Sequence, residues 1–144
     1  MEELEIFNAQ TQGYVANGLF QIAVVIGVFI AFRAARFARQ NSIIAKVLVS
    51  LFSLIIGFFS LSVGSLRPAL EELTALRLAD AQAAGATLTN NDKAYIDQMG
   101  VSAGDVLPAQ QNLFGDIGTT AFTLIFLLIA LGTIWIPNSN FSEE

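Results

Sequence analysis

The sequence contains no cysteine and no histidine. Their absence removes the usual protein ligands of zinc, haem, copper and iron–sulfur centres, and it excludes disulfide bonds as staples for the loops. The carboxylates lack the spacing of a calcium-binding loop, no glycine-rich phosphate loop follows a strand, and no serine or lysine has a recognisable base beside it. We therefore expect a protein that is not an enzyme, with no catalytic residue, no metal and no cofactor.

Charged residues are also scarce. Only 13% of the 144 residues are charged and 54% are hydrophobic, which gives a mean hydropathy of +0.62. A soluble globule of this length needs more polar surface than such a composition provides. Because the few basic residues do not form a nucleic-acid-binding patch, nucleic acid is not an expected partner. We expect a single membrane domain over residues 1–144.

Three long stretches carry no charge at all, at residues 6–32, 47–66 and 117–136. As a helix, each is long enough to cross a hydrocarbon layer of about 30 Å. The sequence therefore predicts an all-α integral membrane protein with three transmembrane helices, at about 14–32, 47–66 and 117–136. A loop at about 67–116, on the extracytoplasmic side and containing short helices, connects the second and third spans.

The orientation follows from the connector between the first two spans, which carries Arg33, Arg36, Arg39 and Lys46 and no acid. Short basic loops stay on the cytoplasmic side of a membrane. We therefore expect the N-terminus outside and the C-terminus inside, with a bacterial or archaeal cytoplasmic membrane as the simplest setting. Arg33, Arg36 and Arg39 are expected to contact anionic lipid headgroups.

A stripe of small residues runs along the second span, at spacings of three and four that place its members on one face of a helix. The stripe comprises Ser50, Ser53, Gly57, Ser60 and Gly64. In lipid, small residues mark the surfaces where helices approach each other closely. The sequence therefore predicts a helix-packing seam along this face.

The first span has a shorter stripe of the same kind, with Ala23, Gly27 and Ala31 at spacings of four. The simplest expectation is that the two stripes pack on each other and form an antiparallel hairpin. The alternative is that at least one of them faces another protein chain.

The outer loop shows helix signals in two places. Pro68 suits either a first helical turn or a kinked continuation of the second span, and the amphipathic segment that follows is expected to end before Gly85. Thr89 with an acid three residues later resembles an N-terminal cap, which predicts a short helix over residues 90–99 that Gly100 ends.

Two further features of this loop bear on its shape and its contacts. Ser102 followed by Asp105 offers another helix start, and Pro108 suits a first turn leading towards the third span. Asp92, Tyr95 and Asp97 are candidate contacts with a partner. We expect the loop to lie on the outer membrane surface or against a partner.

We expect the protein to be a noncatalytic structural or accessory subunit of a larger multi-subunit membrane assembly. Its partners would be other membrane-protein subunits or copies of itself, together with lipid. The small-residue seams, the apolar surface in excess of what three helices can hide, and the absence of catalytic signatures favour this hypothesis.

Two alternatives remain open. The first is a homo-oligomeric pore, which Asn17, Gln21 and the serines of the second span could line. Its topology, three spans with the N-terminus outside and the C-terminus inside, is similar to that of some phage holins. The second is a membrane structural protein of a lipid-containing virion, docked to an outer shell through the anionic loop.

Overall fold

The computed structural model describes residues 3–106, 112–114 and 116–136. Within this part of the chain there are four α-helices: α1 (Glu3–Arg39), α2 (Ile43–Ala83), α3 (Asn90–Met99) and α4 (Ile117–Trp135). The fold is all-helical, and α1, α2 and α4 are each long and apolar enough to cross a membrane. These three helices identify an integral membrane protein.

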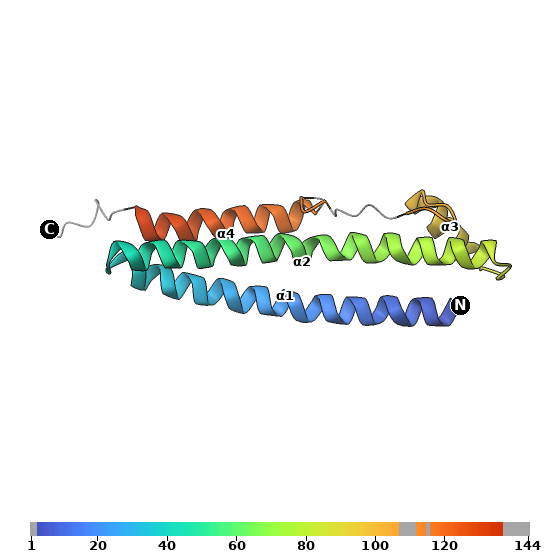
Figure 1. Cartoon of the computed structure of the whole chain (residues 1–144), viewed down its shortest axis with the longest axis horizontal. Coiled ribbons are helices and arrows are strands. Elements are labelled where there is room, and N and C mark those ends of the chain that lie inside the picture. Colours follow the sequence, from blue (N-terminus) through green and yellow to red (C-terminus); the bar gives the residue numbers. More distant parts are fainter. Residues whose placement is uncertain (1–2, 107–111, 115, 137–144) are drawn as a thin grey trace.

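The helices form an elongated bundle whose two ends differ (Figure 1). The antiparallel helices α1 and α2 run along its length, α4 lies beside the first half of α2, and α3 lies at the far end of α2. The 19 residues of α4 measure about 28 Å, close to the hydrocarbon thickness of a bilayer. The 41 residues of α2 measure about 60 Å, so this helix continues well beyond α4.

This extension, which we call the projection, consists of residues 3–16 of α1, 67–83 of α2 and helix α3. Its core is formed by buried side chains from all three helices and the loop before α3: Ile6, Leu78, Ala79, Ala81, Leu88 and Ile96. Ile6 is only 1% exposed, although it belongs to the first charge-free stretch. That stretch therefore continues past the membrane segment, and its first residues pack against protein.

Helix α2 passes through Pro68 without a break. The expected amphipathic helix of the outer loop is thus a direct continuation of the second span. Proline has no N–H to donate to the carbonyl of Gly64, one turn earlier, so one backbone bond is missing at this level. The helix ends at Ala83, and Gly85 follows with a φ of 96°, a left-handed conformation that favours glycine.

Helix α3 begins and ends at the residues that its caps predict. The Thr89 side chain accepts a hydrogen bond from the backbone N–H of Asp92, and the Asp92 carboxylate accepts one from the backbone N–H of Thr89, which is a capping box. Gly100 ends the helix with a φ of 66°. Ser102 and Asp105 form a turn and not a helix start, and Pro108 lies outside the described residues.

Candidate helix-packing site and outer recess

The small-residue stripe of α2 faces α4. A Cβ added at Gly57 would lie 3.1 Å from the side chain of Leu127, and one added at Gly64 would lie 2.5 Å from the Cγ2 of Thr119. The expectation that this stripe packs on the stripe of α1 was therefore wrong. Close approach does occur along the stripe, but the approaching helix is the third span.

Polar contacts accompany this packing. The Thr123 hydroxyl donates to the Ser60 hydroxyl over 2.9 Å, and the Trp135 indole N–H donates to the Ser50 hydroxyl over 2.9 Å. Ser53 is fully buried and donates to a carbonyl of its own helix. In lipid, such bonds between helices contribute about 0.6–2 kcal/mol each. The stripe is thus a hydrogen-bonded seam inside this chain.

The spacing of small residues defines a face of a helix but not the helix that covers it. Helix α4 suits the α2 stripe because Thr119 and Thr123 lie one turn apart, so both reach the same face. Helix α1 packs on an adjoining face of α2, where a Cβ added at Gly27 would lie 2.7 Å from the Cδ1 of Ile56. From the sequence, the α1 stripe and another protein chain were the candidate partners of this face, and periodicity alone did not point to α4.

The three residues of the α1 stripe have different surroundings. Gly27 is buried against α2, and Ala31 is fully buried in a cluster with Phe126 and Ala130 of α4. Ala23 is exposed on the outside of the bundle. Gly27 and Ala31 therefore pack the three spans together, whereas Ala23 lies on the exposed surface of the bundle.

Asp116 fixes the start of α4, a role that the sequence interpretation missed. Its carboxylate accepts hydrogen bonds from the backbone N–H groups of Gly118 and Thr119 over 3.2 and 3.1 Å, and it also accepts one from the Thr119 hydroxyl. The bond from the Thr119 side chain is the main reason why the pKa of Asp116 is lowered. An acid immediately before an apolar run was the available signal.

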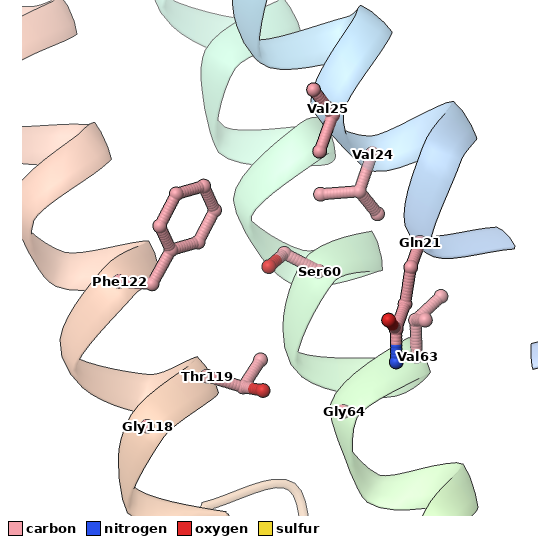
Figure 2. Close-up of a pocket in the computed structure, with 9 residues that line it drawn as sticks. All are labelled: Gln21, Val24, Val25, Ser60, Val63, Gly64, Gly118, Thr119 and Phe122. Atoms are coloured by element: carbon pink, nitrogen blue, oxygen red, sulfur yellow. The ribbon is translucent and has the colours of Figure 1, made fainter. Parts of the chain in front are cut away.

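A recess opens between α1, α2 and α4 at the level of Gly64 (Figure 2). It encloses about 280 Å³. Figure 2 shows Ser60 and Gly64 of α2 between Gln21 of α1 and Thr119 of α4. A second cavity of about 310 Å³ shares Gln21, Gly64 and Thr119 and adds Arg67, Pro68, Glu71 and Asp116. The recess therefore passes from an apolar region into a charged one where α4 begins.

Glu71 links all three helices of the projection. Its carboxylate accepts from the Tyr14 hydroxyl of α1 over 3.4 Å and from the Arg67 guanidinium over 3.1 Å. Its backbone carbonyl accepts from the Tyr95 hydroxyl of α3 over 2.8 Å. A tyrosine hydroxyl is protonated at neutral pH and can donate this bond, and burial raises the pKa of Tyr95 further.

The three candidate partner contacts differ in how much of each side chain is available. Asp92 is 7% exposed and its carboxylate caps α3. Tyr95 is half-buried and bonded to Glu71. Asp97 is exposed. Of this set, Asp97 is therefore the residue that another chain can reach without disturbing α3.

The predicted headgroup contacts lie at the C-terminal end of α1, with Arg33 and Arg36 exposed and Arg39 half-buried in the last turn. At this end, the Lys46 ammonium lies 5.9 Å from the centre of the Trp135 ring, within the range of a cation–π contact. These contacts pack the helices against one another, and they leave an acidic projection at one end of the bundle and the basic α1–α2 connector at the other.

No known protein family matches this chain, and no curated protein or solved structure matches it either.

Proposed function

We propose that this protein is a noncatalytic structural or accessory subunit of a larger multi-subunit membrane assembly. The observation that carries the proposal is the continuity of α1 and α2 from the membrane segment into the projection. Because neither helix is interrupted at the boundary, we infer that the projection keeps its orientation relative to the membrane segment. A rigid, membrane-anchored arm of this kind suits a scaffold that positions another protein.

The charge of the projection supports a role in binding another protein. The accessible acids of the projection and of the loop after α3 are Glu5, Glu71, Glu72, Asp80, Asp97 and Asp105. The bases of the same region are Arg67, Arg77 and Lys93. The projection is therefore acidic, and it is suited to a partner with a basic surface, since complementary charge steers association and selects partners. We place this surface on the outer side of a bacterial or archaeal cytoplasmic membrane, with the basic α1–α2 connector inside.

The internal use of the α2 stripe bears on the alternative hypotheses. Ser53, Ser60 and Asn17 are buried within this chain, so an oligomeric pore would have to be lined without them. Ala23 and the neighbouring apolar residues of α1 remain on the outside, where a partner's helix or lipid can cover them. We therefore place the contacts between subunits on the exposed face of α1, which includes Ala23, and on the projection.

The orientation of the chain in the membrane is tested by introducing single cysteines. The sequence contains no cysteine, so any labelling reports the introduced one. Asp97→Cys is expected to react with a membrane-impermeant maleimide in intact cells, because it lies on the outer projection. Gln40→Cys, in the α1–α2 connector, is expected to react only after the membrane is permeabilised. The reverse pattern would contradict the proposed orientation.

The contact surface is tested by reversing two exposed acids of the projection, Glu5→Lys together with Asp97→Lys. We expect at least a tenfold drop in the amount of other protein that copurifies with each copy of the chain in mild detergent. Lys93→Gln is the matched control, because it makes α3 more acidic and should leave copurification unchanged. Equal copurification with the doubly reversed variant would reject the projection as the contact surface.

A further inference from the structure

A second groove, separate from the outer recess, lies between α1 and α4 near the inner end of the spans. It encloses about 430 Å³ and is lined by Phe29, Phe32, Arg33, Arg36, Ile129 and Thr133. Four of these residues precede the end of α1 by one to three turns, and the other two lie in the second half of α4. The groove is therefore at the depth where acyl chains meet the inner headgroup layer.

The apolar part of the groove has a fixed wall. The Phe32 ring packs edge-to-face on Phe126, with their centres 5.5 Å apart, and this pair belongs to the core of the membrane segment. Phe29 and Ile129 are 63% and 52% exposed, so their side chains are open to an occupant. An acyl chain would find a preformed apolar surface here, and its binding would not require the helices to separate.

The polar part of the groove is basic. Arg33 and Arg36 are three residues apart on α1, so their side chains lie on the same face of the helix. Both line the groove and both are exposed. Two guanidinium groups side by side match the oxygens of a phosphate, to which each can donate two parallel hydrogen bonds.

The neighbouring sequence does not neutralise this pair. There is no aspartate or glutamate between Glu5 and Glu71, and α4 has none. Glu5 lies 28 residues before Arg33 along α1, which corresponds to about 42 Å. The tail residues Glu143 and Glu144 lie outside the described residues. An anionic occupant therefore gains the attraction of both arginines, whereas a lipid with no net charge gains little.

We propose that this groove is a specific binding site for an anionic phospholipid. The phosphate is held by Arg33 and Arg36, and one acyl chain lies along Phe29, Phe32 and Ile129. Basic pockets between transmembrane helices on the cytoplasmic side bind anionic headgroups in this way. The proposal does not depend on the proposed function, and it goes beyond a diffuse attraction of the connector to the membrane because it separates Arg33 and Arg36 from Arg39.

The test is native mass spectrometry of the full-length protein in detergent, titrated with phosphatidylglycerol or phosphatidylcholine. We expect phosphatidylglycerol to bind at least tenfold more tightly than phosphatidylcholine. Arg33→Gln with Arg36→Gln should weaken its binding about 10- to 30-fold. Arg39→Gln removes a charge from the same end of α1 outside the groove, and it should change binding less than about twofold.

Two further measurements separate this site from other kinds of attraction. Thr133→Phe fills the groove while leaving both arginines in place, and it should weaken phosphatidylglycerol binding about as much as loss of the arginines. Glycerol 3-phosphate, which has no acyl chain, should not compete. Equal binding of the two lipids, equal losses in the Arg39 variant, unchanged binding in the Thr133 variant or competition by glycerol 3-phosphate would each overturn the proposal.

Discussion

Replacing Gly64 with alanine is expected to lower the free energy of unfolding by about 1–3 kcal/mol, the usual cost of overpacking a tight contact. The added Cβ would lie 2.5 Å from the Cγ2 of Thr119 and 2.7 Å from its Cβ. Thr119 cannot easily turn away, because it is β-branched and its hydroxyl donates to Asp116. The start of α4 must therefore move away from α2.

The measurement is chemical unfolding in mild detergent, followed by tryptophan fluorescence. The chain has one tryptophan, and the N–H of Trp135 is bonded to Ser50 of α2, so its emission reports the packing of α4 on α2. Gly18→Ala is the matched control, because nothing lies within 4 Å of a Cβ added there, and it should be neutral or stabilising by up to about 1 kcal/mol.

Gly27→Ala gives an intermediate case, which tests whether the cost depends on how freely the contacted side chain can move. The added Cβ would lie 2.7 Å from the Cδ1 of Ile56, which is the end of a flexible side chain and can move. Its cost should therefore be smaller than that of Gly64→Ala. If the Gly64 and Gly18 variants unfold at the same denaturant concentration, the close contact between α2 and α4 does not exist.

Replacing Leu78 with alanine is expected to cost about 2–5 kcal/mol and to release α3 from the projection. Leu78 is 0% exposed and packs with Ile6 and Ile96, so its loss leaves a cavity where α1, α2 and α3 meet. We expect the projection to lie in water, where burial of apolar side chains drives packing. Between helices that are surrounded by lipid this driving force is absent, so the same substitution there would not remove it.

Hydrogen exchange of the α3 amides measures this effect. In the Leu78→Ala variant, residues 90–99 should lose protection, whereas α4 should keep its own, because Leu78 has no part in the core of the membrane segment. Leu4→Ala is the matched control, since Leu4 is 69% exposed. Unchanged protection of α3 in the Leu78 variant would contradict the described core of the projection.

The features that depend on local signals were predicted well from the sequence. The three spans follow from length and lack of charge. The bounds of α3 follow from a capping box and a terminal glycine, both of which act within a few residues. These signals suffice because each is decided by neighbouring residues, whatever the rest of the chain does.

The features that depend on distant parts of the chain could not be predicted. The α2 stripe identified a packing face, but whether α1 or α4 covers it depends on how all three helices fit together. Ile6 carried an apolar signal that does not distinguish lipid from a protein core. Tyr95 looked like an exposed contact, and only the placement of α3 on α2 brings its hydroxyl to the carbonyl of Glu71.

The central claim is that this chain serves as a subunit of a larger assembly, and it is tested most directly by the composition of the native particle. The protein would be extracted in native-membrane discs through a tag placed after Glu144, and the mass and polypeptides of the particle would be determined. We predict a stoichiometric set of other proteins. A particle that contains only copies of this chain would contradict the claim, and a closed ring of copies would favour a pore.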